Sequence, residues 1–329
     1  MPTLLAQLMP QRGSQYADLV AALAPHELAL SPLGPLLQDV TPVTLAGQAF
    51  LRCTLAALPD DATWTALAAP ALVAAFYEEA ETMGGRPGPW LRPLELPFTP
   101  AFPPDLAIAR RYRGKTNELL THLLCNLARG ASHLANTPWS ELRVFDPLAG
   151  GGTVLFTALI LGAEVAGVEQ DAQDVQSTAT YLRQFMAEAH LACRLKEERL
   201  RGLGKRWSFA LGNPSRRCIL AQGDTVQSAA LVAGFKPHLL VTDLPYGIQH
   251  QGPLRDLLNR SLPVWAGMLP PGGALAFAWD ATRFPREEMT VLVETAAPLT
   301  VRNAPPYDSL AHRVDRVIKH RDLLVAVRL

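Results

Sequence analysis

The chain has 329 residues, of which 49% are hydrophobic and 18% are charged, so global disorder is excluded and one or two folded domains are expected. Thirty Lys and Arg residues balance thirty Asp and Glu residues, which excludes nucleic-acid binding through bulk charge. Any site for a polyanion must therefore be local.

The cysteines and the apolar segments indicate the compartment. Four cysteines are scattered with no Cys-x-x-Cys pair, which predicts neither a zinc ribbon nor a disulfide framework. The opening segment lacks a basic stretch followed by an apolar one, and no apolar run approaches the ~20 residues of a membrane span. We expect a cytoplasmic protein with no metal site and no membrane anchor.

The first hundred residues predict a small α+β unit. A strand is expected at 3–8, a helix around 16–23, and an Ala-rich helix around 71–81, just after Pro70. Trp64 and Phe76 lie among alanines and leucines, which favours core packing over a platform for stacking nucleotides. Residues 1–100 carry four Arg and no Lys against nine Asp and Glu, a net charge of −5.

A proline-rich segment follows this unit. Residues 86–104 read RPGPWLRPLELPFTPAFPP, and prolines remove backbone donors from helices and central strands. The segment therefore predicts a linker or extended strap, with a second domain over 105–329.

The second domain alternates strand and helix patterns. This alternation predicts a doubly wound, mostly parallel α/β sheet with helices on both faces, whose ligand site lies at the carboxyl ends of the strands. Four consecutive predicted strands end in an acidic residue at that edge. Helices are expected at 117–135, 153–161 and 171–191, and strands at 142–146, 163–169, 217–224, 238–243, 272–280 and 320–329.

A glycine-rich turn, DPLAGGGT, spans residues 146–153 between a strand and a helix. Gly150 and Gly152 allow positive φ and close approach of a ligand to the backbone. A dinucleotide fingerprint would need a third glycine where Leu155 stands, and a phosphate loop ending at residues 114–116 would need a glycine where Ala109 stands. NAD-type and ATP-type loops are both disfavoured.

Acidic residues follow the next two predicted strands. Glu169, about twenty residues beyond the turn, is placed to accept both hydroxyls of a ribose. Asp224 is placed to accept from the exocyclic amine of an adenine, and an N-cap of a helix starting near Val226 is an equal alternative. The turn and Glu169 together predict a nucleoside-containing ligand.

The fourth predicted strand ends in Thr242-Asp243-Leu244-Pro245-Tyr246-Gly247. The order DPLAGGGT, GVEQD, GDT, DLPYG resembles class I S-adenosylmethionine (SAM)-dependent methyltransferases, and among them the amino-methyltransferases with an Asp/Asn-Pro-Pro-Tyr motif. The strongest resemblance is to THUMP-linked RNA methylases that modify guanine N2 in tRNA or rRNA. Their upstream Tyr-x-Gly-Lys/Arg-Thr segment is matched here by residues 112–117, and the resemblance covers about residues 105–329.

The chemistry of an exocyclic amine explains this motif. Such an amine is a poor nucleophile because its lone pair is delocalised into the ring. The Asp243 carboxylate and the Leu244 carbonyl can accept from it and stabilise the positive charge that develops in the transition state. Pro245 would fix the turn, and Tyr246 would offer a face on which the target base stacks. Leu244 stands where the group usually has a first Pro.

The resemblance implies SAM as the cofactor and RNA, with guanine in tRNA expected, as the substrate. It implies that Asp243 is catalytic and that Leu244, Pro245 and Tyr246 bind the substrate. The alternatives are an amino-methyltransferase that acts on DNA or on a protein glutamine, and a non-catalytic nucleic-acid-binding module. By the same resemblance, Asp146, Gly150 and Gly152 would wrap the methionine part of the cofactor, Glu169 the ribose and Asp224 the adenine, while Thr116 and Asn117 would lie over it.

A basic segment suggests how RNA is captured. Residues 191–217 carry eight Lys and Arg against two Glu, and the part from Arg194 to Arg217 predicts a basic flap that contacts phosphates. The alternative is a solvated helix end with Glu–Arg pairs. A second basic stretch, from His312 to His320, is interpreted as a solvated hairpin.

Overall fold

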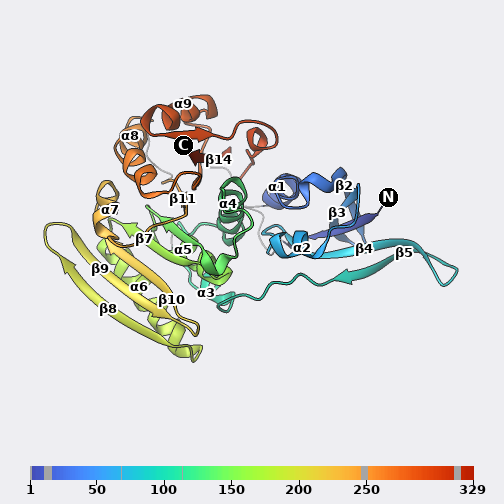
Figure 1. Cartoon of the computed structure of the whole chain (residues 1–329), viewed down its shortest axis with the longest axis horizontal. Coiled ribbons are helices and arrows are strands. Elements are labelled where there is room, and N and C mark those ends of the chain that lie inside the picture. Colours follow the sequence, from blue (N-terminus) through green and yellow to red (C-terminus); the bar gives the residue numbers. More distant parts are fainter. Residues whose placement is uncertain (1, 11–16, 68, 113, 246–250, 315–319) are drawn as a thin grey trace. The chain divides into compact units, whose positions relative to one another are not determined.

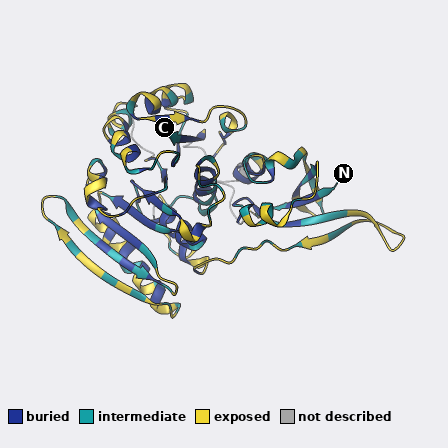
Figure 2. Ribbon diagram, viewed as in Figure 1, coloured by how far each residue is buried: buried dark blue, intermediate teal, exposed yellow. Residues whose placement is uncertain are grey.

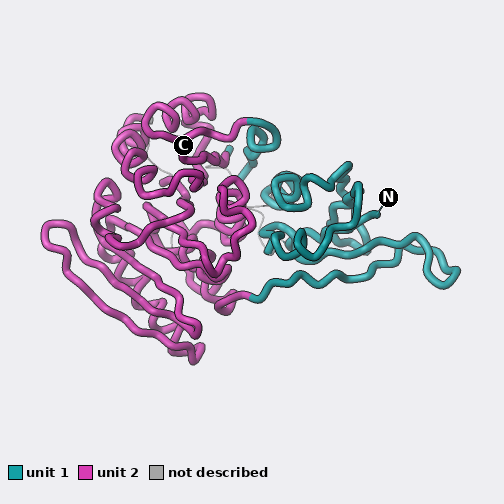
Figure 3. The backbone as a smooth tube through the Cα atoms, in the orientation of Figure 1, with its two compact units in different colours: residues 1–99, 304–320 teal, residues 100–303, 321–329 magenta. Residues whose placement is uncertain are grey.

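The computed structural model describes residues 2–10, 17–67, 69–112, 114–245, 251–314 and 320–329. The chain forms two compact units, drawn in two colours in Figure 3. Unit 1 comprises residues 1–99 and 304–320, and unit 2 comprises residues 100–303 and 321–329. Residues 304–320, which the sequence analysis placed within the second domain, thus belong to the first unit.

Unit 1 is built on a five-stranded antiparallel sheet in the order β2-β3-β1-β4-β5. Leu4, Leu5 and Ala6 of the central strand are all buried. The rings of Trp64 and Phe76 pack edge to face at 5.6 Å, so these aromatics belong to the core, as the sequence predicts. The strands are β1 (Thr3–Leu8), β2 (Leu37–Leu45), β3 (Gln48–Leu55), β4 (Val73–Met83) and β5 (Arg86–Leu94), and the helices are α1 (Ala17–Ala29), α2 (Asp61–Leu67), η2 (Gly34–Leu36) and η5 (Tyr307–Ser309).

The predicted helix around residues 71–81 is wrong. This segment is strand β4, which pairs antiparallel with β1 on one side and with β5 on the other. Phe76 is buried, while Glu79 forms an ion pair with Arg52 of β3. Pairing on both sides overrides the helix propensity of the alanines and glutamates, because propensity is a weak prior against tertiary contacts. Helix α2 was not predicted.

The proline-rich segment is partly a strand. Its first half forms β5, the edge strand of the sheet, and the second half is the extended connection to unit 2. Prolines are tolerated on an edge strand because they need not donate to a further neighbour.

Unit 2 contains a nine-stranded sheet. Figure 1 labels most of its elements. Its strands are β6 (Arg143–Asp146), β7 (Glu164–Glu169), β8 (Cys193–Leu200), β9 (Gly204–Leu211), β10 (Arg216–Gln222), β11 (Leu239–Asp243), β12 (Ala274–Asp280), β13 (Leu299–Val301) and β14 (Arg321–Arg328). Its helices are α3 (Asp105–Ile108), α4 (Glu118–Ala131), α5 (Thr153–Leu161), α6 (Ala172–Glu188), α7 (Ser228–Leu231), α8 (Gln251–Met268), α9 (Arg286–Ala296), η3 (Trp139–Glu141) and η4 (Thr225–Gln227).

The strand order is β13-β14-β12-β11-β6-β7-β10-β9-β8, and the five strands from β12 to β10 run parallel. The chain builds outward from β6 in both directions, so the order reverses between β6 and β11. In open α/β sheets ligands bind at such a reversal, outside the carboxyl ends of the strands. The doubly wound α/β fold predicted from the sequence, with a small N-terminal α+β unit, is confirmed.

Helices cover both faces of the parallel part of this sheet. Helices α4, α5 and α6 pack on one face, where α4 contacts β11 and β12 and α6 contacts β7 and β10. On the other face, Phe145, Phe277 and Trp279 share a buried core with Leu262 and Trp265 of α8. Strands buried on both faces read as near-continuous apolar runs, which is why the sequence identifies them.

The basic segment beyond residue 191 is neither a flap nor a helix end. It forms the antiparallel hairpin β8–β9, and β9 pairs with β10. The hairpin therefore extends the sheet beyond β10, at the end of the parallel strands that lies away from β11. Figure 2 shows β8 as a mixture of exposed and intermediate residues. At about 4.8 Å per strand, β8 lies roughly 24 Å from β11 along the sheet. Of the alternatives, the Glu–Arg pairs do occur, because Glu198 binds both Lys196 and Arg206.

Candidate active site

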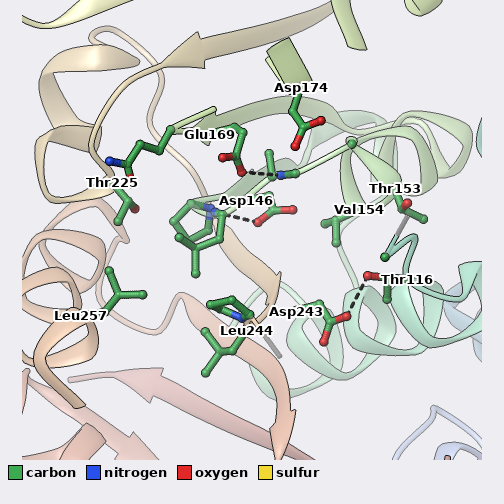
Figure 4. A pocket seen from close by; sticks show the side chains of 18 of the residues that line it. Thr116, Asp146, Thr153, Val154, Glu169, Asp174, Thr225, Asp243, Leu244 and Leu257 are labelled. Atoms are coloured by element: carbon green, nitrogen blue, oxygen red, sulfur yellow. Dashed lines mark hydrogen bonds between the residues drawn. The ribbon is translucent and has the colours of Figure 1, made fainter. Parts of the chain in front are cut away.

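A cavity of about 500 Å³ opens at the carboxyl ends of the parallel strands of unit 2. Figure 4 shows side chains from separate strand ends converging on it. Eight of the residues that the sequence singled out line it together, and they are Thr116, Asp146, Gly150, Glu169, Asp224, Asp243, Leu244 and Pro245.

The glycine turn forms one wall of the cavity. Gly150 has φ +48° and Gly152 has φ +88°, so both positions use the left-handed backbone conformations that glycine adopts at no steric cost. Gly152 is the N-cap of α5 and is not among the lining residues; it shapes the turn rather than facing the space. A Cβ on Gly152 would come within 3.0 Å of the Thr178 methyl group and 3.3 Å of the Phe156 ring.

Glu169 ties this turn to the end of β7. Its carboxylate accepts hydrogen bonds from the backbone N–H of Gly150 at 2.9 Å and of Asp171 at 2.8 Å. A carboxylate offers about four acceptor positions, so Glu169 can hold the turn and still accept hydroxyl groups of a ligand.

Asp146 is the most deeply buried carboxylate of the cavity, with 2% of the residue exposed. It accepts a hydrogen bond from the Leu148 N–H at 3.1 Å. Burial raises the pKa of Asp146 to about 7, and the carboxylates of Glu169 and Asp243 act in the same direction. A cationic ligand would favour the ionised form and reverse this effect.

Asp243 stands at the end of β11, on the other side of the strand-order reversal from Asp146. Its Oδ2 accepts a hydrogen bond from the Thr116 hydroxyl at 2.7 Å. The next residue, Leu244, donates its N–H to the Ala278 carbonyl at 2.9 Å and buries its side chain in the core, with 1% exposed. A leucine therefore serves at this position as an apolar anchor for the turn. Tyr246 and Gly247 lie outside the described residues, so base stacking on Tyr246 stays a prediction.

Two of the predicted cofactor contacts also act as helix caps. Asp224 accepts from the Val226 N–H at 3.0 Å as the N-cap of η4, and it faces Arg260 at 3.6 Å while lining the cavity. Asn117 is the N-cap of α4, where its amide oxygen accepts from the N–H groups of Leu119 and Leu120. Asn117 does not line the cavity. The capping alternative for Asp224 therefore holds, and Asn117 has a structural role that the sequence analysis did not assign.

Further residues complete the cavity. Tyr112 covers the glycine turn: its hydroxyl is hydrogen-bonded to Thr153, and a Cβ on Gly151 would lie 2.2 Å from its ring. Asp174 of α6 and Leu257 of α8 line the space as well. The Tyr-x-Gly-Lys-Thr motif identified the segment that carries Tyr112, but nothing in the sequence indicated its partner Thr153 or the contribution of α8.

The described part of the chain holds neither a metal-binding cluster nor a membrane-spanning helix. No group of three or more His, Cys, Asp or Glu side chains there is arranged to hold a metal ion. No helix there is both long enough and apolar enough to cross a lipid bilayer.

No family model matches the sequence, and no curated protein matches it. Among solved structures, TrmN of Thermus thermophilus is similar over 100% of this chain and 100% of its own, with 15% identity and a TM-score of 0.48. The 16S rRNA N2 methyltransferase RsmC of the same organism, in complex with AdoMet and guanosine, is similar over 90% of this chain and 60% of its own, with 16% identity and a TM-score of 0.39. The rRNA methyltransferase aviRa of Streptomyces viridochromogenes is similar over 68% of this chain and 91% of its own, with 17% identity and a TM-score of 0.40. Methyltransferases, the class that the sequence motifs resemble, are thus among the similar structures.

Proposed function

We propose that the chain is a SAM-dependent methyltransferase that methylates an exocyclic amine of an RNA base, with guanine N2 in tRNA as the expected target. The observation that carries this proposal is the charge of the cavity. Five carboxylates line it, and no Lys, Arg or His is among its described lining residues; the five are Asp146, Glu169, Asp174, Asp224 and Asp243.

This charge discriminates between cofactors. NAD and ATP carry phosphates, which would meet carboxylates with no cation to pair with among the described lining residues. SAM carries a sulfonium, an ammonium and one carboxylate, hence a net positive charge, and it has no phosphate, so the carboxylates of the cavity favour it over NAD and ATP. The residues present therefore fit SAM, with Asp146 near the cationic methionine part, Glu169 on the ribose and Asp224 near the adenine.

The reaction needs little beyond orientation and charge stabilisation. When bound, SAM supplies an electrophilic methyl group. The amine nitrogen would take this methyl group, with the electron pair of the former methyl–sulfur bond left on sulfur, and its proton would pass by way of the Asp243 carboxylate to solvent. Asp243, at the cavity wall, accepts a hydrogen bond from the amine and stabilises its developing positive charge. The Leu244 carbonyl is the proposed second acceptor.

The proposal predicts that SAM affinity depends on pH through Asp146. Burial raises the pKa of this carboxyl to about 7, whereas a bound cation favours the ionised form. SAM binding should therefore tighten about tenfold between pH 6 and pH 8, as the ionised fraction of Asp146 rises from about a tenth to about nine tenths. Isothermal titration calorimetry at the two pH values measures this change.

The matched control for this experiment is Asp146→Asn, which should bind SAM more weakly and lose most of the pH dependence. NAD and ATP should produce no binding signal. Binding of NAD without any response to SAM would overturn the proposed function, and an unchanged pH dependence in Asp146→Asn would remove Asp146 from the cofactor site.

The capture of RNA is proposed to involve the exposed cations of the β8–β9 hairpin. Arg199, Arg201 and Lys205 are all exposed around the hairpin turn. Arg206 is less available, since its side chain is 17% exposed and bound to Glu198. In the second basic stretch, Arg316 and Lys319 lie outside the described residues, and His312 is buried.

Changing Arg199, Arg201 and Lys205 together to Gln should weaken RNA binding and leave SAM affinity unchanged. Each lost phosphate contact should flatten the slope of log affinity against log salt by about 0.9 or less. Fluorescence anisotropy with labelled tRNA over a salt series measures both effects. The matched control replaces three exposed cations outside the hairpin, Arg86, Lys236 and Arg302, by Gln. Equal losses in the two triple variants would contradict a specific role of the hairpin.

A further inference from the structure

The segment from Arg110 to Thr116 is fixed at both of its ends to the proposed active site. Arg110 and Tyr112 contact the glycine turn at one end, and Thr116 contacts the Asp243 carboxylate at the other; residue 113 lies outside the described residues. Tyr112, Gly114 and Thr116 all line the cavity between these two attachments. The segment therefore bridges the cofactor side and the substrate side of the site.

The first attachment is to the glycine turn. The Arg110 guanidinium donates to the Gly151 carbonyl and, at 2.6 Å, to the Thr178 hydroxyl, and it lies 5.0 Å from the centre of the Tyr112 ring. The Tyr112 hydroxyl is bonded to Thr153, the first residue of α5. Gly151 has to lack a side chain because the Tyr112 ring occupies the place of its Cβ.

The second attachment is the hydrogen bond from Thr116 to Asp243. Thr116 is followed directly by Asn117, the N-cap of α4, so the backbone after it is held by the start of a helix. Lys115, just before it, donates to the Ala107 carbonyl at 2.7 Å and forms an ion pair with Glu118. The Thr116 hydroxyl is therefore presented to Asp243 from a backbone fixed on both sides.

We propose that Thr116 is a positioning residue, which holds the plane of the Asp243 carboxylate for the incoming amine. The family resemblance implies a different role, in which Thr116 contacts the cofactor. This inference rests on the proposed function. A carboxylate at the end of a strand can rotate about its side-chain torsions, and a donor fixed at Oδ2 selects one orientation. Through Tyr112 and Arg110, the same segment sets this orientation relative to the glycine turn that holds the methyl donor.

The test compares Thr116→Val, which removes the hydroxyl at nearly constant shape, with Thr116→Ser, which retains it. We expect Thr116→Val to lower the kcat for methylation of tRNA roughly tenfold to a hundredfold, the effect of losing a hydrogen bond to a charged group. The SAM Kd from calorimetry and the KM for RNA should change less than threefold, and Thr116→Ser should restore most of kcat. Thr121→Val, which removes a buried hydroxyl bonded to Thr157 and away from the cavity, is the matched control and should keep kcat near wild type.

A double-mutant cycle separates positioning from a general loss of structure. In an Asp243→Ala background, Thr116→Val should lower kcat no further, because the group that it orients is gone. Additive losses, or a weaker SAM Kd with unchanged kcat, would overturn the inference and favour the role in cofactor binding.

A measurement without turnover keeps this inference distinct from the proposed function. The carboxyl carbon resonance of Asp243 can be followed by NMR over a pH series. Loss of a donor that favours the ionised form should move its titration midpoint to higher pH in Thr116→Val and not in Thr116→Ser. If the wild type methylates no RNA, the proposed function fails; a midpoint that does not move overturns the positioning role whatever the reaction.

Discussion

Asp243→Ala is expected to lower methyl transfer by roughly 10²–10³, the effect of removing one preorganised group that stabilises developing charge. SAM affinity should be nearly unchanged, because Asp146 and Glu169 remain in place and the resemblance assigns the cofactor to them. Asp243 lies at the cavity wall at the end of β11, where it can act on the amine. Single-turnover kinetics with saturating SAM and tRNA measures the chemical step apart from binding.

The matched control is Asp280→Ala. Asp280 ends the neighbouring strand β12 at the same edge of the sheet but is not among the residues that line the cavity. This variant should transfer methyl groups at close to the wild-type rate. A wild-type rate for Asp243→Ala would show that the DLPYG motif does not have the role proposed for it.

Gly152→Val is expected to abolish measurable SAM binding. The φ of +88° disfavours any side chain with a Cβ, and a β-branched one most. The new Cβ would also press on Thr178 and on the Phe156 ring, so the turn that carries Gly150 must shift. Calorimetry reports the binding, and thermal unfolding reports whether the variant is still folded.

Gly234→Val separates steric pressure on the turn from backbone strain. Gly234 has a similar φ of +84°, but nothing lies within 4 Å of the position of its Cβ. The Gly234→Val variant should be less stable than the wild type, since a left-handed conformation costs a residue with a side chain about 1–2 kcal/mol. It should still bind SAM with wild-type affinity. Equal SAM affinity in the two folded variants would contradict the assignment of the glycine turn to the cofactor.

The parallel core of unit 2 was predictable because its signals are local. Strands β6 and β7 are short apolar runs ending at Asp146 and Glu169, and the glycines between them mark the turn and the start of α5. Parallel strands place their carboxyl ends at one edge, so sequence alone brought Asp146, Glu169 and Asp243 together.

The errors arise where partners distant in sequence decide the structure. Residues 71–81 form β4 because β1 and β5 pair with them, and neither pairing leaves a pattern in the segment itself. The basic segment became the β8–β9 hairpin, although its charges alone also suit a loop or a helix end. The bond between Thr116 and Asp243 joins residues that are 127 positions apart, and no local signal predicts it. The N-cap role of Asn117 did have a local signal, since Asn is a preferred N-cap and a helix was expected to begin there.

The most direct test of the proposed function is nucleoside analysis of RNA after reaction with SAM. RNA from cells lacking the protein is incubated with the purified chain and SAM bearing an isotopically labelled methyl group, then digested to nucleosides and analysed by mass spectrometry. The proposed function predicts labelled N2-methylguanosine from the tRNA fraction with the wild type and almost none with Asp243→Ala. Label found only on ribose hydroxyls or on ring carbons, or only in DNA or protein, would contradict methylation of an exocyclic amine in RNA.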